Sequence, residues 1–209
     1  MYPCVHTITN KRKMCYIITI STAALIIAAA NFLWDGVYSP AAFGMLLLTT
    51  AFGVVAVIAV DGLLAFIIRR LPEGWFAPEA KAFDVGKRER NFYRKSGINT
   101  WKKHVPEWGC FTGFHKDKMR EPNDSAYIGR FLLESNYGVA GHIAGAFFGF
   151  LIMLIPILRP FSMALPIAAV NFVLSLLPTM VLRYNTPALR GLYRRNVERD
   201  KKKTDAKPR

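Results

Sequence analysis

The sequence predicts an all-α membrane protein in which four transmembrane helices form two hairpins. Of the 209 residues, 52% are hydrophobic, although the formal net charge is +14. The apolar residues are gathered into four long runs, and almost all of the charge lies between or beyond those runs. Each run is long enough to cross a hydrocarbon core about 30 Å thick as a helix. Soluble fold classes do not combine these properties.

The four predicted spans are helical because backbone within a bilayer must satisfy its own hydrogen bonds. The second run contains one charged residue, Asp61, and the third contains one ionisable imidazole, His142. The chain length suits one domain. The spans cover residues 15–33, 41–68, 139–158 and 162–182 of a single membrane domain, residues 1–209.

Lysine and arginine residues predict the orientation. Three precede the first span, 14 lie in residues 69–138 and ten follow Leu182, whereas residues 34–40 carry none and residues 159–161 carry one. Basic loops stay on the cytoplasmic side. We therefore predict a multi-pass protein of the cell membrane with both termini in the cytoplasm. A cleaved signal peptide ending near Ala30 is the alternative, but the apolar run continues through Leu33, which favours an uncleaved helix.

The predicted cytoplasmic segment, residues 69–138, is aromatic as well as basic. Its rings suit either a segment on the membrane surface or one that folds over the helix bundle and covers a pocket. Residues 88–101 are predicted to form an interfacial helix, and another helix is predicted to begin at the cap Asp124 and run into the third span. Residues 196–209 are predicted to be a disordered basic tail that contacts anionic lipids.

His142 is the first candidate for chemistry. Ionisable residues within spans are costly and usually face a polar interior, and histidine exchanges a proton near neutral pH. Glu134 lies eight residues earlier and about 80° away around one helix, so it could orient the imidazole. The alternatives are a histidine bonded at the headgroup level and a surface glutamate paired with Arg130.

Asp61 is the second candidate, about 12 Å deep from Arg69 at helical rise. A charge there is either functional or is neutralised by protonation or by a polar partner such as Asn171 on a neighbouring helix. After the fourth span, Arg183 is typical of an interface anchor. Asn185 and Pro187 predict a turn.

Other site types find little support in the sequence. His104, Cys110 and His115 match no common metal spacing, so no metal site is expected. The remaining cysteines, Cys4 and Cys15, form no CxxC pair. The chain has no phosphate-binding or nucleophile-elbow motif. Four spans also argue against a nucleic-acid partner.

Three stretches of the second half carry a family resemblance. The first runs from Asn91-Phe92-Tyr93-Arg94-Lys95 to Ile98, Trp101, Lys102 and Pro106. The second is Arg130-Phe131-Leu132-Leu133-Glu134 with His142, and the third is Pro178 with Arg183-Tyr184-Asn185, Pro187 and Leu189. In order and spacing they resemble the glycosyl-4,4'-diaponeurosporenoate acyltransferases, small membrane proteins of carotenoid synthesis that esterify a sugar hydroxyl of a glycosylated carotenoid with a fatty acyl chain.

The resemblance has departures. The family tends to carry a glutamate three residues before the histidine and an aromatic residue after it, where this chain has Val139 and Ile143. The arginine expected shortly after Glu134 is replaced by Asn136 and Tyr137. If those groups bind or activate substrate, the chain acts on a different acceptor or has lost activity.

The resemblance implies a membrane-bound O-acyltransferase acting on a glycosylated carotenoid or similar glycolipid. His142 would remove the proton from a sugar hydroxyl, Glu134 would orient His142, and Arg183 or Asn185 would stabilise the oxyanion. The acyl donor, for example acyl-coenzyme A, is a co-substrate, and no cofactor is expected. The predicted substrate-binding residues, whose basic members would meet the donor phosphates, are Arg94, Lys95, Trp101, Lys102 and Lys103.

Two other functions remain open. A non-catalytic lipid-binding or accessory subunit of a membrane complex would tolerate changes at Glu134 and His142, but not on the aromatic face of Phe92, Tyr93 and Trp101. A small transporter would need polar residues lined along the spans, and few are present. The expected partners are membrane lipids, a lipophilic glycosylated acceptor and a fatty acyl donor, while the oligomeric state is left open.

Overall fold

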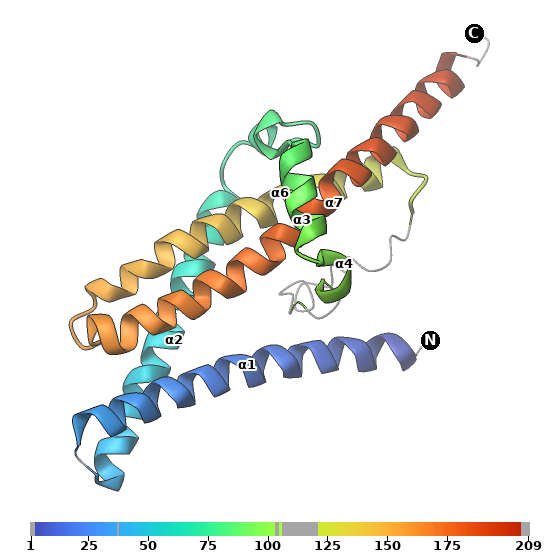
Figure 1. Ribbon diagram of the computed structural model, residues 1–209. Helices are drawn as coiled ribbons and strands as arrows, with labels where there is room; N and C mark the ends of the chain where they lie inside the picture. The colour runs from blue at the N-terminus through green and yellow to red at the C-terminus, as the bar shows by residue number, and fades with distance from the viewer. Residues whose placement is uncertain (1–2, 37, 103–104, 106–120, 206–209) are drawn as a thin grey trace.

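Four long helices form the body of the protein in the computed structural model (Figure 1). The structure describes residues 3–36, 38–102, 105 and 121–205. Every regular element among these residues is helical, and four helices are long and apolar enough to cross a membrane, which confirms the predicted fold class. The long helices are α1 (Pro3–Asp35), α2 (Pro40–Ile68), α6 (Ser125–Phe148) and α7 (Leu165–Asp205). The shorter elements are the 3-10 helices η1 (Glu73–Phe76), η2 (Lys81–Phe83) and η3 (Gly149–Leu154), the π-helix η4 (Pro160–Ala164), α3 (Lys87–Lys95) and α4 (Ile98–Trp101).

The long helices are arranged as two hairpins, α1 with α2 and α6 with α7 (Figure 1). The two hairpin connections meet at one end, where Arg159 Nη1 lies 2.6 Å from Asp35 Oδ1. We call this the turn end. The opposite end, where α2 finishes at Arg69 and α7 carries most of its arginines, is the basic end.

The α6–α7 hairpin is the most closely packed part of the bundle. Glycines on α6 allow this approach: a Cβ atom at Gly129 would lie 3.1 Å from the Tyr193 ring, and one at Gly138 would lie 3.2 Å from Leu182 Cδ1. α6 begins where the sequence predicts, because Asp124 caps it by accepting a hydrogen bond from the Ala126 amide at 2.8 Å.

α7 continues through both of its internal prolines, so the turn predicted at Asn185 and Pro187 is wrong. Proline removes one backbone donor, but tertiary packing on α6 holds the helix together. The predicted disordered tail is also wrong for residues 196–205, which are helical. Asn196 Nδ2 donates to the Pro122 carbonyl at 2.9 Å and thereby joins this part of α7 to the start of α6.

Residues 72–102, which we call the covering segment, lie across the basic end of α6 and α7 (Figure 1). The single helix predicted over residues 88–101 is divided at Gly97, whose φ of 68° only glycine adopts readily. Phe76, Phe83 and Tyr93 point inward and are buried. Folding over the bundle, one of the two predicted arrangements, is therefore what the structure shows for these rings.

Candidate functional site

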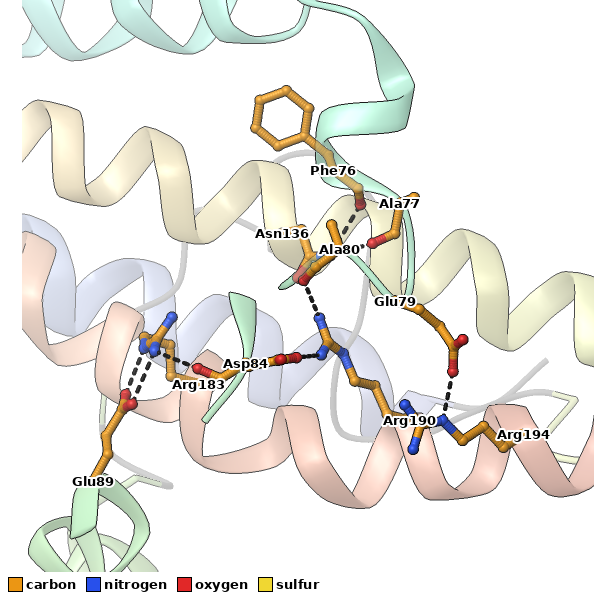
Figure 2. Close-up of polar contacts among 10 residues, drawn as sticks. All are labelled: Phe76, Ala77, Glu79, Ala80, Asp84, Glu89, Asn136, Arg183, Arg190 and Arg194. Atoms are coloured by element: carbon orange, nitrogen blue, oxygen red, sulfur yellow. Dashed lines mark hydrogen bonds and ion pairs between the residues drawn. The ribbon is translucent and has the colours of Figure 1, made fainter. Parts of the chain in front are cut away.

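Three arginines on one face of α7 hold the covering segment (Figure 2). Arg183, Arg190 and Arg194 are spaced by seven and four residues, which brings them to the same side of a helix. Each forms an ion pair with a carboxylate of the segment. We call these residues the arginine row.

Arg190 is the most buried member, with 8% of its side chain exposed. It pairs with Asp84, and its Nη2 also donates to the Ala80 carbonyl at 2.8 Å. A buried guanidinium is tolerated only when it is paired and hydrogen-bonded. Arg194 forms the outer contact, 2.5 Å from Glu79, with both side chains largely exposed. Such an exposed pair contributes little to stability.

Arg183 joins α7 to α3. Its Nε and Nη2 lie 2.5 and 2.9 Å from the two Glu89 oxygens, and Nη2 also donates to the Asp84 carbonyl at 3.0 Å. The Tyr93 hydroxyl donates to the same carboxylate at 2.5 Å. The hydrogen bond from Arg183 lowers the pKa of Glu89. Burial, followed by the neighbouring Glu89, raises the pKa of Tyr93 to about 12.

Asn136 on α6 holds the start of the covering segment (Figure 2). Its fully buried Nδ2 donates to the Phe76 and Ala77 carbonyls at 2.9 and 3.1 Å. It stands at one of the positions where the sequence departs from the family pattern, and a short amide fits there because both acceptors are backbone carbonyls close to α6. The adjacent Tyr137 ring stacks on Phe76 with centroids 4.3 Å apart.

Glu134 lies between two arginines. It accepts from Arg130, four residues earlier on α6, and from Arg69 at the end of α2, both at 2.8 Å. The pairing with Arg130 is the alternative that the sequence left open for Glu134, and the contact with Arg69 adds a link between α2 and α6. Whether Glu134 also orients His142 stays a prediction.

His142 lies on the packed face of α6. Gly138, His142, Gly145 and Gly149 fall within about 60° of one another at 100° per residue. The three glycines face Leu182, Asp61 and Asn171, respectively, so this face is the one that meets α2 and α7. His142 itself is half-buried. It lies one helical turn from Gly138 in the direction of the turn end.

Asp61 and Asn171 form a polar pair deeper in the bundle. Asn171 Nδ2 lies 3.4 Å from Asp61 Oδ1 and 3.3 Å from the Gly145 carbonyl. The glycines leave room for this pair: a Cβ atom at Gly145 would lie 2.5 Å from Asp61 Oδ1 and one at Gly149 would lie 2.7 Å from Asn171 Nδ2, so a larger residue would displace these side chains. A polar contact with Asn171, one of the alternatives that the sequence left open for Asp61, is therefore what the structure shows.

The four predicted substrate-binding residues that the structure describes lie on α3, on α4 or directly after α4, and Trp101 and Lys102 are half-buried. Arg94 and Lys95 are exposed, and Arg94 donates to Asn91 Oδ1 at 2.6 Å. Trp101 donates to the Ser96 carbonyl at 2.9 Å, and Lys102 Nζ lies 5.1 Å from the centre of the Tyr184 ring. Lys103 lies outside the described residues. Asn185 is half-buried on α7.

Sequence reasoning missed four residues of this end: Asp84, Glu89, Asn136 as a hydrogen-bond donor, and Arg190. Their contacts between α6 or α7 and the covering segment join residues 59 to 110 positions apart, so no local pattern signals them. Within the described ranges, no cluster of histidine, cysteine or acidic residues could hold a metal. His104, Cys110 and His115, where the sequence predicts no metal site, lie outside those ranges.

The fold and these contacts define a polytopic helical membrane protein whose second hairpin is capped by a hydrogen-bonded segment. The chain belongs to the glycosyl-4,4'-diaponeurosporenoate acyltransferase family, which matches residues 72–195, more than half of its length. No curated protein and no solved structure matches it. The matched residues begin with the covering segment and end one residue after Arg194, so α1 and α2 lie outside the match.

Proposed function

We propose that the protein is a membrane-bound O-acyltransferase that esterifies a sugar hydroxyl of a glycosylated carotenoid or similar glycolipid. Membership of an acyltransferase family supports the reaction class. The observation that carries the proposal further is the position of His142, a half-buried imidazole on the packed face of α6 inside the family-matched residues. An amphiphile in the bilayer can reach such a depth with its sugar while its apolar part stays in lipid.

In the proposed reaction, His142 accepts the proton of the sugar hydroxyl as that oxygen attacks the carbonyl carbon of an acyl thioester. A carbon–oxygen bond forms, the carbon–sulfur bond breaks, and the proton passes from His142 to the departing thiolate. The proposal gives Glu134 the role of orienting His142, although its two contacts with arginines also fit a purely structural role.

Arg183 and Asn185 are the proposed donors to the developing oxyanion. Arg183 uses Nε and Nη2 for Glu89 and the Asp84 carbonyl. Its Nη1 takes no part in these three hydrogen bonds, which supports a further donor role. The same guanidinium positions α3, so we expect its substitution to affect both docking and rate.

The acyl donor is proposed to be acyl-coenzyme A arriving from the cytoplasm. Its phosphates would meet Arg94, Lys95, Lys102 and Lys103, and Trp101 would lie beside them. Arg94 and Lys95 are exposed on α3, which leaves their charges available to a phosphate.

The test uses the full chain in lipid nanodiscs with radiolabelled palmitoyl-coenzyme A and a glucosylated apocarotenoid. We expect a labelled ester from the wild type, and about 100-fold or more slower ester formation from His142→Ala, the usual loss for a general base. Lys202→Ala, at the far end of α7, is the matched control. Full activity of a normally folded His142→Ala protein would contradict the proposed role of His142 as general base. No ester from the wild type with several acyl donors would favour the accessory-subunit function.

A further inference from the structure

A cavity of about 350 Å³ lies at the turn end, between the two hairpins. One wall comes from the end of α1 and the first turns of α2, and the other from residues 157–163, which connect α6 to α7. All four candidate membrane spans have an end beside this cavity, so it lies at the level of the lipid headgroups in a bilayer. The exposed side chains of Trp34 and Tyr38 are typical of that depth.

Contacts away from the charged residues hold the two walls together. Asn31 on α1 is 3% exposed, and its Nδ2 donates to the Ser162 carbonyl of η4 at 2.8 Å. The Phe32 and Phe43 rings pack edge to face with centroids 5.2 Å apart and join α1 to α2. The cavity is therefore preformed, and a ligand can bind without ordering its walls.

The charges of the cavity come from Asp35 and Arg159. One carboxylate oxygen, Oδ1, lies 2.6 Å from one guanidinium nitrogen, Nη1. Asp35 Oδ2 and the Nε and Nη2 atoms of Arg159 take no part in this contact, and the two side chains are 23% and 49% exposed. The pair has no net charge, but it places a negative group and a positive group side by side on the cavity wall.

A ligand that matches this wall carries one cation and one anion joined by a short link. When its cation lies beside Asp35 and its phosphate lies beside Arg159, each of the four charges has neighbours of opposite sign. A purely anionic headgroup is attracted by Arg159 but repelled by Asp35. An uncharged sugar gains hydrogen bonds with both residues, but it lacks the attraction between full charges.

The lining also distinguishes between kinds of cation. A primary ammonium group donates N–H hydrogen bonds to carboxylate oxygens, whereas a quaternary ammonium has no donor and is typically recognised by aromatic rings. No aromatic residue is present among the described residues that line the cavity. Met45 and Ile157, each 63% exposed, also line it and provide an apolar surface for acyl chains.

We propose that this cavity binds a zwitterionic phospholipid whose cation is a primary ammonium, such as phosphatidylethanolamine. The ammonium lies on Asp35, the phosphate lies on Arg159, and the acyl chains follow Met45 and Ile157. The proposal rests on no part of the proposed acyl transfer. The cavity lies at the opposite end of the bundle from the arginine row, and most of its lining precedes residue 72, where the family match begins.

The test is native mass spectrometry of the full chain released from nanodiscs. The bulk lipid is phosphatidylcholine, and a small share of phosphatidylethanolamine, phosphatidylglycerol or monoglucosyl diacylglycerol with the same acyl chains is added in turn. Ala42→Phe places a ring in the cavity, so the part of each adduct that this variant removes measures binding there. In the wild type we expect phosphatidylethanolamine to be enriched about tenfold at this site over its share of the lipid, a gain of roughly one hydrogen bond between charged groups.

Asp35→Asn keeps the shape of the side chain and removes its charge. We expect this variant to lose the enrichment of phosphatidylethanolamine and to gain binding of phosphatidylglycerol, because Arg159 is left without its carboxylate. Asp200→Asn is the matched control, since it makes the same change in an exposed ion pair near the end of α7 and should behave as the wild type.

The wild-type ranking of the lipids tests the proposal without any substitution at the ion pair. Equal or greater enrichment of phosphatidylglycerol or of the glucosyl lipid at this site would overturn it. A phosphatidylethanolamine adduct that is unchanged in Ala42→Phe would place the lipid elsewhere on the protein. An unchanged preference in Asp35→Asn would show that the carboxylate does not select the headgroup, and either result would also overturn the proposal.

Discussion

Replacing Asn136 by aspartate is expected to release the start of the covering segment. The change substitutes one oxygen for the amide nitrogen and preserves the shape of the side chain. The wild-type Nδ2 donates to the Phe76 and Ala77 carbonyls at 2.9 and 3.1 Å. An ionised aspartate has no donor and turns a negative charge towards both oxygens.

The free energy lost in this variant follows from the hydrogen bonds that each carbonyl still accepts. The Ala77 carbonyl still accepts from the Ala80 amide at 2.9 Å, so its loss is about 1 kcal/mol, the net value of one hydrogen bond. The Phe76 carbonyl has no second partner among the described residues, and an unsatisfied buried group costs about 1–3 kcal/mol. The sum, about 2–4 kcal/mol, corresponds to a roughly 30- to 1,000-fold rise in the equilibrium constant for local opening.

Amide hydrogen exchange in nanodiscs measures this opening at amides that donate within the segment, which are those of Trp75, Ala77, Ala80, Phe83 and Asp84. Asn99→Asp, the same change at an exposed asparagine of α4, is the matched control and is expected to leave these amides unchanged. Protection in Asn136→Asp within about threefold of the wild type would show that these two hydrogen bonds do not hold the segment.

Three other outcomes are expected. The hydrogen bond from Arg183 lowers the pKa of Glu89, so the stability that this pair contributes is fully present above the unfolded pKa of about 4.3 and is lost as the pH falls through the pKa of the folded state. Exchange protection of α3 should therefore fall in acid. The fall should be much smaller in Glu89→Gln. Burial raises the pKa of Tyr93 to about 12. The contribution of its hydroxyl to folding stability is therefore complete below the unfolded pKa of about 10 and disappears between pH about 10 and about 12. A phenolate absorbance titration should show this late step in the wild type and lose it in Tyr93→Phe. Gly145→Ala puts a Cβ atom 2.5 Å from Asp61 Oδ1 and should lower the free energy of unfolding by about 1–3 kcal/mol. The measurement is the thermal midpoint, which should fall and be partly restored by adding Asp61→Gly. No drop in the midpoint would contradict this packing.

The presence of four helices long and apolar enough to span a membrane, and the start of α6, could be predicted because their causes are local. Uninterrupted apolar runs require helices in lipid, and Asp124 is a side chain that caps the helix it precedes. The break at Gly97 was missed because a single glycine inside a helical pattern is compatible with a continuous helix. The turn at Pro187 was wrong because packing on α6 outweighs the lost backbone hydrogen bond.

The candidate site was predictable only where a polar residue had few possible partners. Asp61 lies in an apolar span, so Asn171 on another span was a natural partner, and the two do meet. Arg183 was recognised as an interface residue, but its contact with Glu89, 94 positions away, depends on the path of the covering segment across the bundle. That path follows from the complete set of tertiary contacts and not from any local spacing.

The arginine row has a consequence for how the covering segment responds to change. Its three contacts lie on one rigid helix and bind one continuous stretch of chain, from Glu79 to Glu89. The segment is therefore a multivalent ligand of α7: when one contact opens, the others hold the freed group at a high effective concentration near its partner. Transient opening of any single ion pair should thus be reversed by rapid rebinding, and release of the whole segment requires several contacts to open together.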